Sequence, residues 1–488
     1  MKSAVFAGTK LRSGVVFASA SKPEEYSNQE EKPPDTNGDG KYPPSQNNLV
    51  ILTHTENPVR EFFNVEDEVW NDWKWQWQNL IRKPEQLTEI VGKFMTPDER
   101  RAAVITHKEF KILISPYYLS LIRWDDLNDP VRKMIIPSIE EIEDNIGEID
   151  PLDEEEDMPV PGLTHRYPDR VLLFTTNMCA GFCRFCTRKR ILGQGDTIPT
   201  YKYFDKIIEY LREHPRVRDI VLSGGDPLVL PLRILEKLLS DLSKIPNIEV
   251  IRIGTRVPVM LPMKLFDPRV ISILEKYSEK LWINTHFNCK NEITPEAKKS
   301  VLNLLKIGIP VNNQSVLLKG VNDSVEIQRE LLRKLMEIKV RPYYLYHCDP
   351  TKGVSHFRTT VWKGMEIMEG LRGHISGLAV PVYVVDAPGG GGKIPLMPNY
   401  LVSASDKTIV LRNYEGSLFS YNPKGDPIEH EKTREHFTGV ISLIKGMKKN
   451  LVPYGTERYE RRRLKIQKPK YTNGNGNEVK IMDLFHRD

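Results

Sequence analysis

Residues 179–186 read Cys-Ala-Gly-Phe-Cys-Arg-Phe-Cys and place Cys179, Cys183 and Cys186 on one short stretch. Three thiolates on one loop can bind three corners of an iron–sulfur cube and leave the fourth iron without a protein ligand. An iron with an open position binds a small molecule, so the spacing indicates a reactive cluster rather than a simple electron carrier. The alternatives are half of a zinc site or three unrelated thiols. Zinc sites favour paired Cys-x2-Cys units, whereas the other cysteines of this chain are single and distant.

The composition limits the location and the partners of the protein. The chain has 488 residues, a formal net charge of +5 and five cysteines. Its length favours two to three domains, and so few cysteines fit a reducing compartment better than a disulfide scaffold. The small net charge requires no nucleic-acid partner. No run approaches the roughly 18 to 20 apolar residues of a membrane span, so neither nucleic acid nor membrane is an expected partner.

The first residues have two interpretations. Residues 1–22 contain four Lys or Arg, several Ser and Ala, and no acid, as organelle transit peptides do. A disordered tail is the preferred alternative, because Ser, Pro, Asn, Gly and Lys dominate up to residue 48. We therefore expect residues 1–55 to be a tail or a targeting segment. The protein is expected in the cytoplasm, or in an organelle matrix if residues 1–22 are a transit peptide.

Residues 56–160 are expected to form a helical N-terminal domain and its linker. Trp70, Trp73 and Trp77 fall at helical spacing, which predicts one helix whose tryptophans face a core. Thr96 followed by Pro-Asp-Glu predicts the start of another helix.

Charge and turn residues mark the ends of the next part of the chain. The linker at 138–157 is acidic, and we interpret its Glu run at 154–156 as a solvated charged stretch. Residues 401–488 are expected to form a β-rich extension with a basic tail. Hairpins are predicted at 405–421, and the basic stretch at 457–470 is interpreted as a solvated terminal helix rather than a nucleic-acid contact.

Residues 161–400 alternate between short apolar runs and helical segments. Strands are expected at 171–175, 219–222, 250–255, 281–287, 310–318, 341–347 and 381–386, and helices at 203–213, 232–245, 270–277, 295–305 and 325–338. Repeated strand–helix units predict parallel strands, either open or closed into a barrel. Polar and Gly-rich residues follow the carboxyl ends of the strands, where α/β barrels build their active sites. The pattern therefore predicts an α/β fold with its site at that end.

The turn Ser223-Gly224-Gly225-Asp226 follows the next strand after the cysteine loop. Small residues let backbone groups approach a ligand closely, although a Gly-Gly turn by itself is weak evidence. Together, the turn and the cysteine loop resemble those of the radical S-adenosylmethionine (SAM) enzymes. The resemblance implies a partial TIM-type (βα)6 barrel, a 4Fe–4S cluster on the three cysteines, and SAM bound at this turn.

Further motifs narrow the resemblance to the lysine 2,3-aminomutases, over roughly residues 60–422. The motifs are Trp70-Asn-Asp-Trp-Lys-Trp75, His165-Arg-Tyr-Pro-Asp-Arg170, Cys186-Thr-Arg-Lys-Arg190, Asn313-Gln-Ser315, Arg341-Pro-Tyr-Tyr344, Asp386-Ala-Pro-Gly-Gly-Gly-Gly-Lys393 and Pro398-Asn-Tyr400. The resemblance implies a second cofactor, pyridoxal phosphate.

Lys393 ends the glycine run of one of these motifs. A phosphate-binding loop needs Gly-x4-Gly-Lys followed by Ser or Thr, but here Ala387 takes the first glycine position and Ile394 follows the lysine. A lysine on a mobile glycine loop beside a barrel mouth suits a Schiff base with pyridoxal phosphate. The resemblance implies this role for Lys393; an exposed loop lysine is the alternative.

Other residues are expected around the two cofactors. Arg166 and Arg170 flank a short turn, and two guanidinium groups suit a dianionic phosphate, although a surface ion pair is the alternative. The resemblance implies that both bind the phosphate of pyridoxal phosphate and that Tyr346 lies beside this cofactor. It also implies that His286 and Gln314 lie near SAM. Tyr346, His286 and Gln314 are equally explained as polar residues of the barrel.

The resemblance also implies how the substrate is held. Arg188 corresponds to the arginine that binds the substrate carboxylate, and Asp349 and Asp386 to the aspartates that bind the side-chain ammonium. Two carboxylates fit a cationic amino acid, which favours lysine and leaves arginine open. A glutamate-specific relative is expected to present basic or neutral groups there.

One departure from the family concerns a structural zinc. Its first cysteine would follow the Gly-Val-Asn-Asp turn, where this chain has Ser324, and no cysteine follows Cys348. The zinc site is therefore expected to be absent, which leaves open how subunits associate.

These features predict a radical isomerase that interconverts L-lysine and L-β-lysine. The resemblance implies that the reduced cluster cleaves SAM to a 5′-deoxyadenosyl radical, which takes a hydrogen from the substrate. An electron donor of flavodoxin or ferredoxin type and a homo-oligomer are expected. The alternatives are an aminomutase for arginine, glutamate or a protein lysyl residue, and a non-catalytic iron–sulfur protein.

Overall fold

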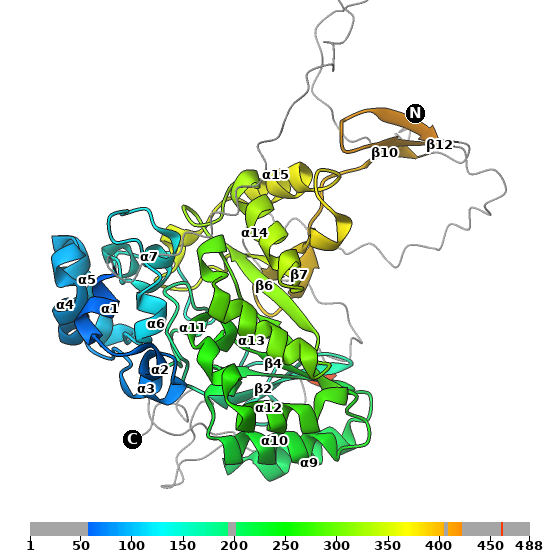
Figure 1. Ribbon diagram of the computed structural model, residues 1–488. Helices are drawn as coiled ribbons and strands as arrows, with labels where there is room; N and C mark the ends of the chain where they lie inside the picture. Colours follow the sequence, from blue (N-terminus) through cyan, green and yellow to red (C-terminus); the bar gives the residue numbers. More distant parts are fainter. Residues whose placement is uncertain (1–56, 194–201, 405–407, 422–459, 462–488) are drawn as a thin grey trace, which may run out of the picture. The chain divides into compact units, whose positions relative to one another are not determined.

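The structure is a computed structural model (Figure 1). Its described residues are 57–193, 202–404, 408–421 and 460–461. The predicted tail at 1–55, with its transit-peptide alternative, and most of the predicted basic stretch at 457–470 lie outside them. In the described part of the chain, no helix has both the length and the apolar character that a membrane span needs.

The N-terminal part of the described chain is built of short helices. They are α1 (Pro58–Phe63), α2 (Asp67–Trp70), α3 (Trp73–Gln78), α4 (Pro84–Val91), α5 (Pro97–Glu109), α6 (Pro116–Leu119) and α7 (Pro130–Ile135). Most begin with a proline, whose missing N–H costs no hydrogen bond in the first turn. Thr96 caps α5, because its hydroxyl accepts from the N–H of Glu99 and the Glu99 carboxylate accepts from the N–H of Thr96. The helix start predicted at Thr96 is confirmed.

The single tryptophan helix predicted from the sequence is wrong. The chain breaks between α2, which ends at Trp70, and α3, which begins at Trp73. Asp72 favours the break, because its carboxylate accepts a backbone N–H of α3 and caps a new helix. Trp70 is buried, whereas Trp73 and Trp77 are half-buried.

A nine-stranded sheet forms the centre of the fold, and its strands follow the order of the chain. They are β1 (Leu163–Tyr167), β2 (Arg170–Thr176), β3 (Asp219–Gly224), β4 (Val250–Gly254), β5 (Leu281–Thr285), β6 (Val311–Leu317), β7 (Arg341–His347), β8 (Val382–Ala387) and β9 (Gly392–Pro395). Strands β2 to β8 are parallel, while β1 and β9 are antiparallel edge strands. The predicted partial (βα)6 barrel is confirmed, and the two antiparallel edges are an addition that the sequence did not indicate.

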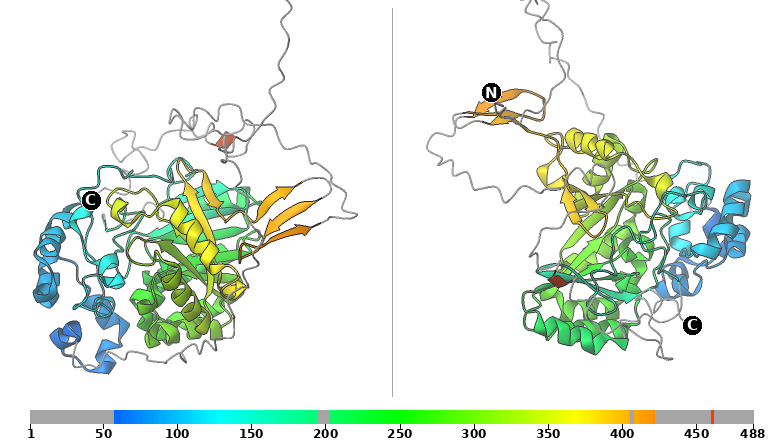
Figure 2. Two further views of the ribbon diagram at one scale, coloured as in Figure 1. Left: turned by 90° about the horizontal axis from the view of Figure 1, so that it is seen from above. Right: turned by 180° about the vertical axis from the view of Figure 1, so that it is seen from behind.

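Helices connect the parallel strands and cover the outside of the sheet, as Figures 1 and 2 show. They are α9 (Phe204–Glu213), α10 (Leu232–Ser243), α11 (Val257–Met260), α12 (Pro268–Lys276), α13 (Pro295–Lys306), α14 (Val325–Glu337) and α15 (Val361–Leu371). In α10 the buried leucines fall at 235, 238, 239 and 242, which is one helical face. The strands and helices predicted for this region are all present, with bounds that differ by a few residues.

Short 3-10 helices occupy several connections. They are η2 (Gly92–Phe94), η3 (Ile139–Glu141), η4 (Pro227–Val229), η5 (Pro262–Phe266), η6 (Ser278–Lys280), η7 (Lys290–Glu292), η8 (Ser355–Phe357) and η9 (Gly377–Ala379). At the position of the expected zinc ligand, the Ser324 hydroxyl caps α14 by accepting the N–H of Ile327. Since the later residues lie largely outside the described ranges, the absence of zinc stays a prediction.

A separate three-stranded sheet follows the barrel. Its antiparallel strands are β10 (Leu401–Ala404), β11 (Ile409–Arg412) and β12 (Leu418–Tyr421). Strands β11 and β12 form a hairpin, so the hairpin predicted within 405–421 is confirmed.

Candidate active site

One cavity of about 390 Å³ lies at the carboxyl ends of the parallel strands. It brings together every residue that the sequence predicted for the site. These are Cys179, Cys183, Cys186, Arg166, Arg170, Arg188, Ser223, Gly224, Gly225, Asp226, His286, Gln314, Tyr346, Asp349, Asp386 and Lys393. The parallel arrangement explains this, because the carboxyl ends of all parallel strands meet at one edge of the sheet.

The cysteine loop follows β2 and is fixed to the N-terminal helical region. The N–H of Phe182 donates to the carbonyl of Leu113 (2.8 Å), and that of Arg184 donates to the carbonyl of Met134 (2.9 Å). The buried Arg184 side chain also forms an ion pair with Glu141 at 2.6 Å. These contacts hold the loop that carries the three thiols.

The three loop cysteines fit an iron–sulfur cluster. All are thiols and half-buried. Burial, which is the largest cause in both thiols, raises the pKa of Cys186 to about 11 and holds the pKa of Cys179 well above its ordinary value, so cluster binding must release their protons. In the described ranges no group of three or more His, Cys, Asp or Glu is placed to hold a single metal ion. The thiols of a cube bind three different irons and need not converge on one point, so this donor set still fits a 4Fe–4S cluster.

Arg256 contacts this loop and was missed at the sequence level. Its Nη1 donates to Sγ of Cys183 at 2.6 Å, and its Nε donates to the carbonyl of His286 at 3.0 Å. The same guanidinium pairs with the fully buried Glu292. The available signal was its position two residues after the end of β4, since other site residues also follow strand ends.

The glycines of the turn after β3 are required by close backbone contacts. A Cβ at Gly225 would lie 2.2 Å from the carbonyl oxygen of Met178, and one at Gly224 would lie 2.7 Å from that of Thr176. Gly224 also has φ +106°, which L side chains rarely adopt. The turn is therefore packed against the start of the cysteine loop.

Asp226 has a different surrounding from the one expected. Its carboxylate accepts hydrogen bonds from Oγ1 of Thr255 (2.7 Å), the N–H of Arg256 (2.7 Å) and the N–H of Leu228 (3.0 Å). The side chain thus joins the ends of β3 and β4. The backbone of Asp226 is also engaged, because its N–H donates to the carbonyl of Met178 (2.8 Å) and its carbonyl accepts the N–H of Val229 (3.0 Å). The predicted contact of Asp226 with SAM stays a prediction.

Three further predicted residues lie around the cavity without a resolved role. His286 forms a hydrogen bond through Nε2 to Asn288 (3.0 Å), and burial lowers the pKa of His286 to about 3, so its ring is neutral. Gln314 lies on β6 and is half-buried. The ring of Tyr346 on β7 lies 5.6 Å from Nζ of Lys393, which fits the predicted place beside pyridoxal phosphate.

Lys393 lies on strand β9, and not on a mobile loop as expected. The glycine run forms the tight turn between β8 and β9, with Gly389 and Gly390 both at φ 68°. Glycine is required at these values because other residues are strained there. Across the ladder Lys393 faces Asp386, and its backbone N–H donates to the hydroxyl of Tyr167 at 2.8 Å. The lysine is therefore held in a defined register at the mouth of the cavity.

The two predicted ammonium-binding aspartates share the same end of the cavity. Burial and the neighbouring Asp386 raise the pKa of Asp349 to about 7, with Lys393 opposing them. Oδ2 of Asp386 lies 3.3 Å from Nζ of Lys393. Its buried Oδ1 has no hydrogen-bond partner among the described residues. A cationic ligand would satisfy this oxygen and stabilise the ionised form of Asp349.

Arg188 is oriented by Glu154, a residue that the sequence analysis assigned to a solvated charge run. That interpretation is wrong for Glu154, which is buried and accepts from Nη2 (2.6 Å) and Nε (3.2 Å) of Arg188. Oγ of Ser223 accepts from Nη1 at 3.2 Å. Of the five guanidinium N–H groups, one on Nη1 and one on Nη2 then remain for a substrate carboxylate.

The two arginines predicted to bind phosphate have different surroundings. Arg166 donates to Asp157 (2.9 Å) and lies 3.9 Å from Asp386. Arg170 is more exposed and stacks over the ring of Tyr167 at 3.9 Å. Both arginines line the cavity, so they fit a bound phosphate. Asp386 lies near both Arg166 and Lys393, so Arg166 is at the same end of the cavity as Lys393.

The cysteine loop after β2, the glycine turn after β3 and the partial barrel define a radical SAM enzyme. A model of the radical SAM superfamily matches residues 173–331. A second model, described as lysine-2,3-aminomutase, matches residues 368–480.

Known relatives extend the likeness over most of the chain. It is 47% identical to the L-lysine 2,3-aminomutase of Clostridium subterminale, over 82% of this chain and 97% of that protein. It is 48% identical to the L-lysine 2,3-aminomutase of Acetoanaerobium sticklandii, over 82% of this chain and 98% of that protein. The chain therefore belongs to the lysine 2,3-aminomutase family. Membership makes it an isomerase and implies a 4Fe–4S cluster, SAM and pyridoxal phosphate as cofactors.

Two other matches are less informative about substrate and fold. The chain is 41% identical to the glutamate 2,3-aminomutase of Clostridioides difficile, over 74% of this chain and 84% of that protein. A solved radical SAM methyltransferase from Sphaerobacter thermophilus covers 46% of this chain, and 68% of that chain is covered, with a TM-score of 0.34 and 21% identity. The first match shows that relatives with different substrates lie at similar distances, so the site itself must decide the substrate.

Proposed function

We propose that the chain interconverts L-lysine and L-β-lysine. One observation carries the choice of lysine. Nζ of Lys393 lies 3.3 Å from Asp386, in a cavity that also holds Asp349. A lysine side chain ends in the same alkylammonium group as Lys393, so the protein's own contact supports an alkylammonium ligand for these carboxylates.

The other end of the substrate would bind to Arg188. Glu154 occupies one edge of its guanidinium and leaves N–H groups on Nη1 and Nη2. A carboxylate can accept both in a bidentate pair. Because the Arg188 side chain is only 17% exposed, water competes poorly for these donors. Arg188 and the aspartate pair would thus hold the two ends of one amino acid.

The cofactors fit between these ends. When bound, the cluster and SAM supply the radical chemistry, and pyridoxal phosphate carries the migrating amino group. Cys179, Cys183 and Cys186 would hold the cluster, Lys393 would attach pyridoxal phosphate, and Arg166 and Arg170 would bind its phosphate. The protein orients the reacting groups and excludes water from them.

Asp349 and Asp386 also distinguish among the alternative substrates and functions. A glutamate substrate would place a third carboxylate beside this pair, which repulsion disfavours. Arginine and a protein lysyl residue are cationic and remain alternative substrates. A non-catalytic iron–sulfur protein would need neither Lys393 nor the aspartates.

Partners and location also belong to the proposal. A flavodoxin or ferredoxin is the proposed electron donor, and a homo-oligomer is the proposed assembly. A cytoplasmic location is proposed because the few cysteines of the chain fit a reducing compartment. The possible transit peptide at residues 1–22 lies outside the described residues.

The experiment is an anaerobic incubation with L-lysine, SAM, pyridoxal phosphate and dithionite, followed by chromatographic and mass-spectrometric detection of β-lysine. Parallel reactions with L-arginine and L-glutamate test the alternatives. We expect β-lysine and no β-glutamate. Product from arginine or glutamate without any from lysine would overturn the proposed substrate, and the absence of every β-amino acid would favour the non-catalytic alternative.

A further inference from the structure

The acidic segment at residues 141–157, which we name the acidic strap, runs between the N-terminal helices and β1. Its charges were expected to be solvated, yet Asp144, Glu154 and Asp157 are buried. Each of these carboxylates contacts an element that carries a predicted substrate or cofactor residue. The strap therefore belongs to the surroundings of the site.

The first half of the strap anchors the loop that follows Asp349. Oδ2 of Asp144 accepts the backbone N–H groups of Gly353 (2.8 Å), Val354 (3.1 Å) and Ser355 (3.1 Å). Burial raises the pKa of Asp144, but hydrogen bonds, first of all from Ser355, outweigh it and hold the pKa well below its usual range. The carboxylate is thus ionised and fixes the loop through three donors.

Backbone contacts bring the strap still closer to Asp349. The N–H of Glu148 donates to the carbonyl of Pro350 (2.8 Å), and the N–H of Lys352 donates to the carbonyl of Glu148 (2.9 Å). A Cβ at Gly147 would lie 2.4 Å from Cα of Lys352, so the two backbones touch. Asp349 directly precedes this pairing, so the strap fixes the backbone next to it.

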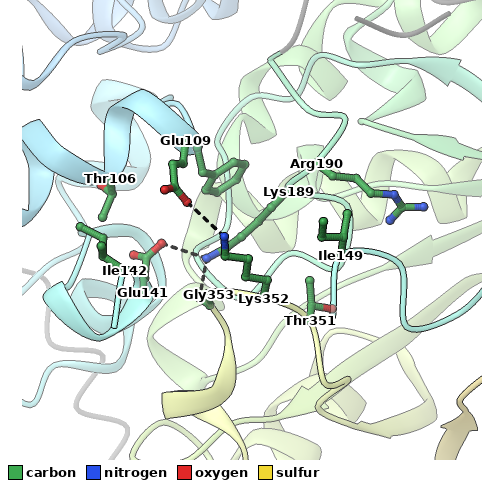
Figure 3. A pocket seen from close by; sticks show the side chains of 11 residues that line it. Thr106, Glu109, Glu141, Ile142, Ile149, Lys189, Arg190, Thr351, Lys352 and Gly353 are labelled. Atoms are coloured by element: carbon green, nitrogen blue, oxygen red, sulfur yellow. Dashed lines mark hydrogen bonds and ion pairs between the residues drawn. The ribbon is translucent and has the colours of Figure 1, made fainter. Parts of the chain in front are cut away.

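A buried lysine joins the strap to both the cysteine loop and the loop that follows Asp349. Figure 3 shows Lys189 reaching between Glu141 of the strap and Gly353, and its Nζ donates to both, at 2.9 Å and 2.6 Å. Lys189 follows Cys186 by three residues. The three segments that meet here are thus linked by charge and by hydrogen bonds.

The second half of the strap holds the opposite end of the substrate site. Glu154 binds two nitrogens of Arg188, as described above. Burial raises the pKa of Glu154, but Arg188 and other arginines lower it to about 2, so the pair is ionised. The carbonyl of Pro151 accepts the N–H of Gly389 in the turn before Lys393 (3.3 Å). Asp144 and Glu154 therefore lie ten positions apart on one chain segment, which connects both ends of the site.

We propose that the acidic strap sets the spacing between Arg188 and Asp349 and thereby selects diamino acids by their length. The inference rests on the proposed function, because it takes these residues as the carboxylate-binding and ammonium-binding groups. Asp144 and Glu154 are positioning residues, since each acts through another residue. Their substitution should change the preference between substrates of different length, and not only the strength of binding.

The test compares L-lysine with L-ornithine, which is one methylene shorter. Dissociation constants are measured for the holoenzyme with SAM but without a reductant, so that no turnover is needed. We expect the wild type to prefer lysine by about tenfold or more. Glu154→Gln and Asp144→Asn act at opposite ends of the site, and both should move this ratio toward one. Equal losses for both ligands, or a wild type without preference, would overturn the proposal.

Matched controls and a second perturbation guard against unfolding. Glu156→Gln and Glu143→Gln change exposed acids of the same strap and should keep the wild-type ratio. If Asp144→Asn does not fold, Gly147→Ala forces the strap away from Lys352, and Gly377→Ala, where a Cβ meets nothing within 4 Å, is its control. A ratio that Gly147→Ala leaves unchanged would count against the proposal.

Failure of the strap proposal can be distinguished from failure of the proposed function. Formation of β-lysine is scored separately, with reductant. Absence of β-lysine with an altered binding ratio in the variants would reject the reaction and retain the strap. Formation of β-lysine with unaltered ratios would reject the strap and retain the reaction.

Discussion

Nζ of Lys393 lies 3.3 Å from Oδ2 of Asp386, and the two residues face each other across the antiparallel ladder of β8 and β9. The lysine proposed to hold the cofactor and the aspartate proposed to hold the substrate are therefore neighbours before either ligand binds. A lysine that attaches to pyridoxal phosphate must leave this ion pair. The ammonium of the substrate can then take the place of the Lys393 ammonium beside Asp386. Attachment of the cofactor and binding of the substrate ammonium are therefore linked through Asp386.

Lys393→Ala is expected to abolish covalent attachment of pyridoxal phosphate. The protein reconstituted with the cofactor should lose the visible absorption of the bound form and release the cofactor on gel filtration. Lys319→Ala, which changes an exposed lysine, is the control and should retain the absorption. Retention of the band in Lys393→Ala would reject the assignment of Lys393.

Lysine binding is expected to weaken as the pH falls below about 7. Burial and the neighbouring Asp386 raise the pKa of Asp349 to about 7, so that below this pH Asp349 is protonated and neutral. An ammonium ligand requires the ionised carboxylate, and the apparent dissociation constant should rise up to about tenfold per pH unit. Titration of lysine binding at several pH values checks this. In Asp349→Asn the dependence should disappear, and a slope that persists there would show that another group titrates.

Asp349→Asn is also expected to stabilise the protein without cofactors at pH 8. Because the pKa of Asp349 is raised from 3.8 to about 7 in the folded state, the folded state keeps a proton that the unfolded state loses between these values. Stability therefore falls as the pH rises through this window, and the whole loss is present above it. Thermal unfolding of both proteins should give a higher Tm for the variant at pH 8 and equal values near pH 3.5. A lower Tm for the variant at pH 8 would contradict the raised pKa.

Arg256→Gln is expected to lower the reduction potential of the cluster. The substitution removes a positive charge and the N–H that Nη1 donates to Sγ of Cys183 at 2.6 Å, and both stabilise added negative charge. Potentiometric titration followed by electron paramagnetic resonance measures this. The variant also leaves the buried Glu292 without its cation, at a cost of about 3 kcal/mol. Glu292→Gln added to Arg256→Gln should restore stability but not the potential; recovery of both would mean that the loss of potential came from misfolding.

Gly225→Ala is expected to weaken SAM binding and to destabilise the fold. A Cβ there would lie 2.2 Å from the carbonyl oxygen of Met178, so the turn must move away from the cysteine loop. Overpacking of this kind costs about 1–3 kcal/mol. SAM affinity by calorimetry and the Tm report the two effects. Gly377→Ala is the control, and an unchanged affinity in Gly225→Ala would show that the turn does not contact SAM.

Much of the barrel could be predicted because its signals are local. The strand at β2 and the helix at α10 follow from apolar runs and helical periodicity that their own residues provide. The tryptophan helix failed because Asp72 caps a new helix between Trp70 and Trp73, and a local cap prevailed over spacing. Strand β9 was missed because the glycine run resembles a loop until β8 supplies its partner.

The residues of the site also divide into those with a local signal in the sequence and those that only the fold brings together. Cys179, Cys183 and Cys186 lie within one loop, so their spacing alone indicates a cluster, and the motif around Lys393 indicates a second cofactor. Glu154 lies in an acidic run that looks solvated, and Arg256 offers only its place after a strand end. Glu154 lies 34 residues from Arg188, and Arg256 lies 73 residues from Cys183, so only the fold brings each pair together.

The sequence by itself determined the residue types that carry the chemistry, the order of strands and helices, and the edge of the sheet where the site forms. Only the tertiary structure decided that the acidic strap is buried against the site, that Lys393 pairs with Asp386 and that the pKa of Asp349 is raised. The reason is physical. Thiols and glycine turns act through their own local geometry, whereas burial, ion pairing and pKa depend on which distant charges the folded chain brings into one cavity.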